Sequence, residues 1–247
     1  MGDVTALQLG DAVIHYDDEG IADGFPVLLI APGGMRSTNE KWNEMPWNPR
    51  LALSDRFRII GMDQRNAGRS TAPVTGDTGW TTYRDDQLAL LDELGIERCH
   101  VVGMCIGGPY IAGLLTHAPG RFASAVLLQP VGIDGNRQAF YDMFDRWADE
   151  CAAAHPEADA GDWSSFRSKM WDGEFVLTAS CDEVASIDVP LVVAMGNDLH
   201  HPQSTSREIA ALAPDVMFLE HWKDDDSLPA TDAVIKNFLA DHTPVAV

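Results

Sequence analysis

The sequence has few cysteines and no long apolar run. Its four cysteines, Cys99, Cys105, Cys151 and Cys181, are widely spaced and form no Cys-x-x-Cys pair, which argues against a zinc site or a disulfide framework and favours reduced thiols. No segment approaches the roughly 18 apolar residues of a membrane span, and the first residues show neither a basic region nor an apolar targeting segment. We therefore expect a cytoplasmic protein that makes no membrane contact.

Basic residues are also scarce. The 247 residues include 17 Lys and Arg against 38 Asp and Glu, which gives a formal net charge of −21. Nucleic acids and anionic membranes are bound through basic patches, so this balance argues against both as partners. Strongly anionic substrates would also be repelled, unless Arg36 or Arg65 compensates locally; an ordinary salt bridge is the alternative role for either side chain.

The sequence does contain short apolar runs that alternate with helix-like segments. The runs cover residues 26–30, 57–62, 99–104, 123–128, 190–195 and 216–221, and residues 4–16 have the pattern of a starting hairpin. Strands that are apolar throughout are typical of a parallel sheet covered by helices on both faces. We predict an α/β fold with a mostly parallel, doubly wound sheet of about eight strands.

Residues 131–185 interrupt this alternation. They contain many aromatic residues among acidic and small ones, and no strand pattern. We interpret them as a small helical cap over the strand ends, where α/β sheets bind ligands, so that residues 1–130 and 186–247 form the core domain. The aromatic residues of this insertion, together with Tyr110, either line a substrate pocket or only pack against one another.

The stretch Gly103-Met104-Cys105-Ile106-Gly107-Gly108 lies where an apolar run ends and a helix-like segment begins. A strand, a sharp turn and a helix form the context of a nucleophile elbow, which exposes a nucleophile at the turn. Gly103 and Gly107 would let the strand and helix backbones pass closely, and a thiol at a helix start has a lowered pKa. Cys105 is therefore the candidate nucleophile, with a buried structural cysteine as the alternative.

With this elbow, four segments in order along the chain resemble the α/β-hydrolase fold superfamily. The other three are Pro32-Gly33-Gly34, similar to its oxyanion loop, Asp63-Gln64-Arg65-Asn66-Ala67-Gly68-Arg69-Ser70, similar to its Asp-x-Arg-Gly-x-Gly-x-Ser loop, and Gly196-Asn197-Asp198, which follows the strand that usually delivers the acid. The chain departs from the pattern in three places: Asn66 replaces a glycine, Cys105 replaces the commoner Ser, and Lys223-Asp224-Asp225-Asp226-Ser227 stands where Gly-x-His is usual.

The resemblance implies roles for individual residues. Cys105 would attack an acyl carbonyl and form a covalent acyl-enzyme. The backbone N–H of Ile106, with that of Gly34 or Met35, would hold the oxyanion. Asp198 would orient a histidine and stabilise its imidazolium form.

The identity of the histidine base stays open. Chain order favours His221, at the end of the last predicted strand, while His200 and His201 follow Asp198 closely and are alternatives. An absent base is a further alternative: a thiolate can still attack without one, but deacylation would be slow, which favours acyl transfer.

We predict a hydrolase that acts through Cys105 on an ester, thioester, lactone or activated C–C bond of a small carbonyl substrate. The resemblance implies neither a metal nor an organic cofactor. An acyltransferase or cyclase on the same fold is one alternative, and a catalytically silent ligand-binding relative is another. The sequence leaves the oligomeric state open, with a homo-oligomer among the alternatives.

Overall fold

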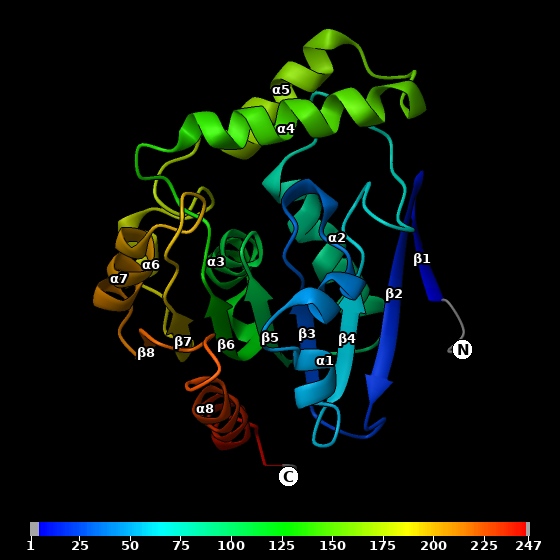
Figure 1. Ribbon diagram of the computed structural model, residues 1–247. Helices are drawn as coiled ribbons and strands as arrows, with labels where there is room; N and C mark the ends of the chain where they lie inside the picture. The colour runs from blue at the N-terminus through cyan, green and yellow to red at the C-terminus, as the bar shows by residue number, and fades with distance from the viewer. Residues whose placement is uncertain (1–4, 246–247) are drawn as a thin grey trace.

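The computed structural model describes residues 5–245, which form a single eight-stranded sheet. Its strands are β1 (Thr5–Leu9), β2 (Ala12–Gly20), β3 (Pro26–Ile30), β4 (Arg58–Met62), β5 (Cys99–Met104), β6 (Phe122–Leu128), β7 (Leu191–Ala194) and β8 (Val216–Leu219). They lie in the order β1-β2-β4-β3-β5-β6-β7-β8 (Figure 1). β2 pairs antiparallel with β1 and β4, and all remaining pairs are parallel. The predicted sheet is thus confirmed, although Val4, in the predicted hairpin, lies outside the described residues.

Helices cover both faces of the sheet, as the uniformly apolar strands predict. They are α1 (Pro49–Ala52), α2 (Trp80–Glu93), α3 (Gly107–His117), α4 (Arg137–Cys151), α5 (Ala160–Trp171), α6 (Cys181–Ala185), α7 (Gln203–Leu212) and α8 (Leu228–Asp241), with short 3₁₀ helices at Gly34–Arg36, Asn39–Glu44, Pro119–Arg121 and Ala152–Ala154. Side chains alternate between the faces of β3: Leu28 and Ile30 join the apolar cluster that includes α2 and α3, and Leu29 joins the one that includes α8. No helix among residues 5–245 is long and apolar enough to cross a bilayer.

The last strand ends earlier than the sequence predicts. β8 stops at Leu219, so His221 follows the strand instead of ending it. The physical reason is the neighbouring Trp222, which turns inward and is fully buried, with its indole N–H donating to the carbonyl of Met195 at 2.9 Å. This turn takes the chain away from the line of the strand.

The departure at Asn66 is accommodated by its backbone. Asn66 has a φ of +57°, the left-handed conformation for which glycine is usual and which Asn tolerates best among the other residues. Its side-chain Oδ1 accepts a 2.7 Å hydrogen bond from the amide of Ala72. The loop after β4 therefore keeps its shape without the glycine.

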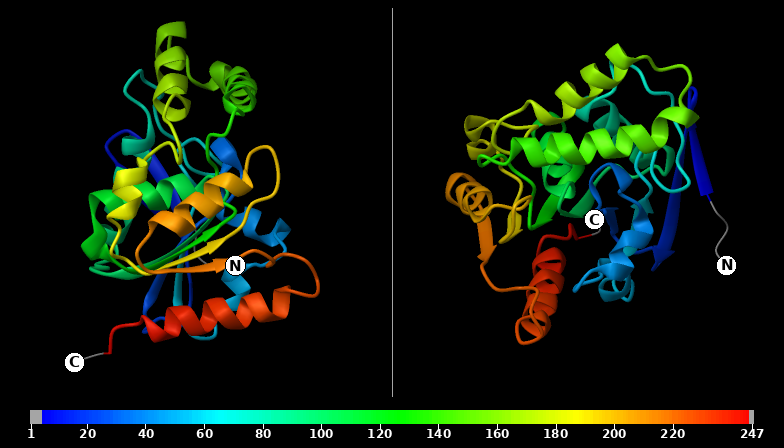
Figure 2. Two further views of the ribbon diagram at one scale, coloured as in Figure 1. Left: turned by 90° about the vertical axis from the view of Figure 1, so that its left-hand side faces the viewer. Right: turned by 45° about the horizontal axis from the view of Figure 1, so that its top comes forward.

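Residues 131–185, which we interpret as a cap, contain α4, α5 and α6, and α4 and α5 lie across the carboxyl ends of the parallel strands (Figures 1 and 2). Their inner aromatic rings pack against rings of the core: Trp171 stacks on Phe140 at 4.9 Å and contacts Trp80 of α2 edge-on at 5.7 Å. The cap and the core therefore share one apolar cluster, so these aromatic rings mainly hold the cap in place.

Candidate active site

Cys105 lies at the turn between β5 and α3, in a strained conformation. Its φ of +61° is rare for a residue with a side chain and is the conformation of an exposed elbow residue. A Cβ at Gly103 would lie 3.0 Å from the Cα of Gly107, and a Cβ at Gly107 would lie 2.8 Å from the carbonyl oxygen of Ile30. The close passage of strand and helix predicted from these two glycines is confirmed, and it leaves the Cys105 side chain half-buried at the strand end.

Asp198 and His201 lie on one short loop after β7. The carboxylate of Asp198 accepts hydrogen bonds from the backbone N–H groups of His200 at 2.9 Å and His201 at 3.1 Å, which is the geometry of an Asx turn. The same turn brings the Nδ1 atom of His201 within 2.8 Å of both carboxylate oxygens. The local sequence Asp-x-x-His therefore builds an acid–imidazole pair from residues three positions apart.

His201 connects this pair to Cys105. Because Nδ1–H donates to Asp198, Nε2 carries the free lone pair; this atom is buried and has no hydrogen-bond partner of regular geometry among the described residues. Burial lowers the pKa of His201, but its interactions with Cys105 and then Asp198 outweigh burial and raise that pKa above the usual range. The imidazole thus interacts with both the Cys105 thiol and the Asp198 carboxylate.

The electrostatics of Cys105 favour the thiolate. Burial raises the pKa of its thiol, and the imidazole of His201, followed by the backbone N–H groups of Gly33 and Ile106, more than offsets burial. The net result is a pKa below that of an ordinary thiol. The half-buried thiols of Cys151 and Cys181 differ, since burial is the main cause that raises the pKa of each.

The structure brings His201, not His221, to Asp198 and Cys105. His221 is exposed beyond β8, and none of its contacts within residues 5–245 joins it to Cys105 or Asp198. Chain order favoured His221 because it assumes that the base follows the last strand. Along the chain the order is Cys105, Asp198, His201, and the last two share one turn. The Asp-x-x-His spacing followed by Pro202 was the available signal in the sequence.

Backbone N–H groups from two elements act on the Cys105 thiol. Those of Gly33, on the loop after β3, and of Ile106 both lower its pKa. The oxyanion roles predicted for Ile106 and for Gly34 or Met35 stay predictions. Gly34 faces the cap: a Cβ there would lie 2.7 Å from the Sδ atom of Met143 in α4. The cap therefore closes the site from above, over the oxyanion loop.

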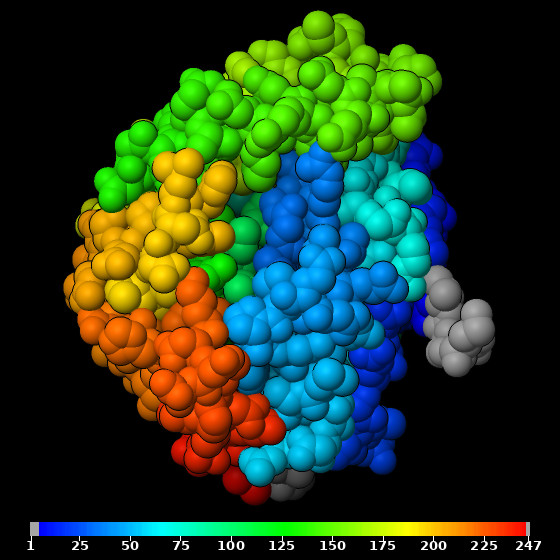
Figure 3. Space-filling model, viewed as in Figure 1, coloured from blue at the N-terminus to red at the C-terminus, as the bar shows by residue number. Residues whose placement is uncertain are grey.

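The two arginines that could have attracted an anionic substrate both form ion pairs with carboxylates of the protein. Arg36 forms an ion pair with Glu150 of α4, and Arg65 forms a two-point pair with the buried carboxylate of Asp86, at 2.6 and 2.8 Å. Figure 3 shows a hollow below α4, between the blue segment that follows β3 and the yellow-orange segment that follows β7. This hollow is the approach to the strand ends.

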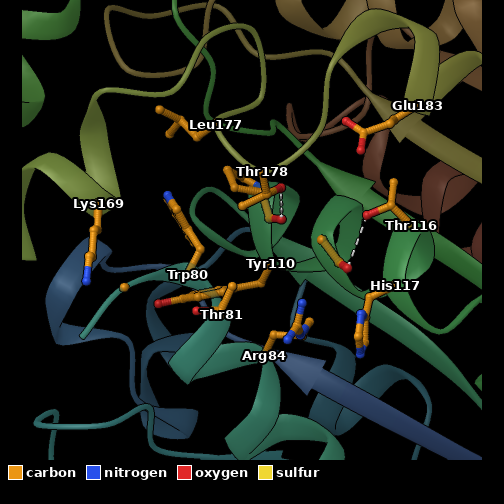
Figure 4. A pocket seen from close by; sticks show the side chains of 13 residues that line it. Trp80, Thr81, Arg84, Tyr110, Thr116, His117, Lys169, Leu177, Thr178 and Glu183 are labelled. Carbon is orange, nitrogen blue, oxygen red and sulfur yellow. Dashed lines mark hydrogen bonds between the residues drawn. The ribbon is translucent and has the colours of Figure 1, made fainter. Parts of the chain in front are cut away.

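A cavity of about 590 Å³ lies away from these residues (Figure 4). It is lined by α2, α3 and the end of the cap, including Trp80, Tyr110 and Leu177, and Cys105 is not among its lining residues. Tyr110 therefore lines a cavity that does not include Cys105. Within residues 5–245, no three His, Cys, Asp or Glu side chains gather in a way that could hold a metal ion.

A family model described as the alpha/beta hydrolase fold matches residues 26–174. This chain belongs to that family. The match of this α/β hydrolase ends before β7, so the loop that contains Asp198 and His201 lies beyond the matched residues.

Individual relatives agree with this assignment. The chain is 34% identical over 117 residues to a candidate carbamate hydrolase of Variovorax paradoxus and 36% identical over 132 residues to a non-heme chloroperoxidase of Streptomyces lividans. The matches cover 47% and 53% of the chain and 41% and 45% of the relatives, so the chain spans less than half of their length. A solved hydrolase of Pseudomonas aeruginosa is similar in fold, with a TM-score of 0.71 over 96% of this chain and 98% of that one, at 23% identity.

Gly196 holds the acid–base turn closed, which provides a test of this geometry. A Cβ at Gly196 would overlap the carbonyl oxygen of His201 and lie 2.6 Å from its Cβ. In Gly196→Ala we expect His201 to move and iodoacetamide alkylation of Cys105 at neutral pH to slow roughly tenfold, since small misplacements of reacting groups cost this much or more. Gly120→Ala is the matched control, because nothing lies within 4 Å of a Cβ there. Equal alkylation rates in wild type and Gly196→Ala would contradict the placement of His201.

Proposed function

We propose that this α/β hydrolase is a hydrolytic enzyme in which Cys105 is the nucleophile, His201 the base and Asp198 the acid that orients it. The observation that supports the proposal most directly is the Nε2 atom of His201, which is buried without a regular partner and acts on the Cys105 thiol. A histidine whose second nitrogen is held by a carboxylate is the arrangement of catalytic triads on unrelated folds.

In the acylation step, the thiolate of Cys105 attacks the carbonyl carbon of the substrate and forms a C–S bond. Negative charge moves to the carbonyl oxygen, and we assign its stabilisation to the N–H groups of Gly33 and Ile106, which also act on the Cys105 thiol. When the tetrahedral intermediate collapses, the bond to the leaving group breaks and the imidazolium of His201 gives it a proton. The product of this half-reaction is a thioester on Cys105.

Deacylation uses the same residues in reverse. Neutral His201 removes a proton from water through Nε2, and the resulting hydroxide attacks the thioester carbonyl. The C–S bond then breaks, the thiolate leaves, and the acid product is released. Because His201 supplies a base, hydrolysis is favoured over the transfer to a non-aqueous acceptor that an absent base would have implied.

The charge distribution points to a small, uncharged substrate. Arg36 and Arg65 are both committed to carboxylates, so neither is free to neutralise an anionic group. Met143 covers the oxyanion loop from above, and the aromatic rings of the cap fill the space behind it. We therefore propose small neutral esters, thioesters or lactones as the substrate class.

Intact-protein mass spectrometry tests the proposal. Mixed with a short-chain p-nitrophenyl ester, wild type is expected to carry a transient acyl adduct that peptide mapping assigns to Cys105, because a thiolate attacks an activated ester readily. Cys151 and Cys181, whose pKa values are raised, provide an internal control and are expected to stay free. Release of acid in step with decay of the adduct would support hydrolysis.

Two outcomes would favour the alternatives. An adduct that decays only when an alcohol, amine or thiol is added would indicate an acyltransferase. Absence of an adduct and of turnover, with Cys105 resistant to iodoacetamide, would contradict the nucleophile assignment and favour a ligand-binding relative.

A further inference from the structure

Lys223 occupies the part of the chain where the resemblance led us to expect a histidine, just after β8. Its Nζ atom donates two hydrogen bonds, at 2.6 Å to Oε1 of Gln129 and at 2.8 Å to Oδ1 of Asn197. Gln129 directly follows β6, and Asn197 lies on the loop after β7. One side chain therefore connects the ends of three neighbouring strands.

Both hydrogen-bond partners of Lys223 are close along the chain to residues that contact or belong to the proposed triad. On one side, Gln129 continues into Val131, whose backbone N–H donates to the carbonyl of Cys105 at 3.1 Å. On the other side, Asn197 immediately precedes Asp198. The opposite, cap-facing side of the Asp198–His201 loop is held by Asn136, whose side-chain amide donates to the carbonyl of Leu199 at 2.6 Å. On the core side, the hydrogen bond from Lys223 to Asn197 holds the same loop.

Among residues 5–245, no carboxylate forms a direct ion pair with the ammonium group of Lys223. Gln129 and Asn197 both offer neutral amide oxygens, and the carboxylate of Asp198 is the opposite charge that acts on the ammonium group. Burial lowers the pKa of Lys223, and the attraction of Asp198 opposes that effect. A cation at this place favours the ionised form of Asp198, which His201 requires.

We infer that Lys223 is a positioning residue: it ties the Asp198–His201 loop to the strand end that supports Cys105 and holds a positive charge beside the Asp198 carboxylate. This inference rests on the proposed function, because it gives Lys223 a part in the same triad. It also gives a reason why this chain has a lysine after β8 although its base lies on the loop after β7.

The pH dependence of Cys105 alkylation by iodoacetamide tests the inference without any substrate. In Lys223→Gln, loss of the positive charge favours the protonated forms of Cys105 and His201, so both titration steps are expected to move to higher pH. We expect alkylation just below neutral pH to slow roughly three- to tenfold. Lys223→Arg keeps the charge and the donors and is expected to restore the wild-type profile.

The control is Lys236→Gln, which removes an equal charge from a pair with Asp232 on α8 and is expected to leave the profile unchanged. The other titratable or charged groups around the loop and around Lys223 remain in every variant; they are His200, Arg146, Glu220, His221 and Asp224. A Lys223→Gln profile that superimposes on wild type would overturn the inference alone. A wild-type Cys105 that is not alkylated at all would instead overturn the proposed function, and the inference with it.

Discussion

Cys105→Ala is expected to lose about 10⁴-fold or more in kcat/KM toward a short-chain p-nitrophenyl ester, because no other group among the described residues can form the acyl-enzyme at this elbow. The measurement is the initial rate of nitrophenol release with subsaturating ester. Cys181→Ala, in a half-buried thiol with a raised pKa, is the matched control and is expected to retain the full rate.

Cys105→Ser separates a complete triad from a lone reactive thiol. A serine hydroxyl attacks only when an adjacent base removes its proton, whereas a thiolate can attack alone. If His201 and Asp198 form a working pair, Cys105→Ser is expected to be clearly more active than Cys105→Ala. Equal rates in the two variants would mean that His201 does not act as a base toward residue 105.

His201→Ala is expected to lower kcat by roughly 10²- to 10⁴-fold, the usual contribution of a general acid–base residue. The imidazole is the largest influence that lowers the pKa of Cys105, so its removal also returns that pKa toward or above the ordinary thiol value. Acylation then requires higher pH, and the acyl adduct, once formed, is expected to persist because water is no longer activated. Stopped-flow acylation and timed mass spectrometry measure the two effects separately.

His221→Ala is the matched control for this prediction, since it removes an exposed imidazole beyond β8. We expect no change in either step. A large loss in His221→Ala with little effect in His201→Ala would restore the assignment that chain order favoured and would require the loop after β8 to move inward.

The pH range of activity follows from the same contacts. The pKa of Cys105 is lowered and that of His201 is raised, so their contact favours the thiolate–imidazolium form over a separate thiol and neutral imidazole. Below the lowered pKa of Cys105 the thiol is protonated and acylation fails. Above the raised pKa of His201 the leaving group no longer receives a proton from the imidazolium, so substrates with poor leaving groups are expected to lose rate first.

The sequence by itself determined the features that depend on local patterns. Continuous apolar runs can be buried only between two layers of helices, so the α/β sheet was predictable from 26–30, 99–104 and similar segments. Glycines on both sides of Cys105 permit a tight crossing of strand and helix that has no room for a Cβ, so the elbow was predictable as well. Asp198 was placed on the loop after β7 for the same reason, since it directly follows an apolar run.

Only the tertiary structure decided which groups meet at the strand ends. His201 interacts with both Asp198 and Cys105 because an Asx turn of Asp198 holds its ring at the strand ends, while His221, which chain order favoured, is exposed just before the buried Trp222. The contacts of three other residues likewise involve neighbours far along the chain: Gly33 acts on Cys105, Arg36 pairs with Glu150, and Lys223 donates to Gln129. Sequence spacing carries no information about such long-range contacts, because they depend on how the sheet brings the ends of β3, β5, β6, β7 and β8 side by side.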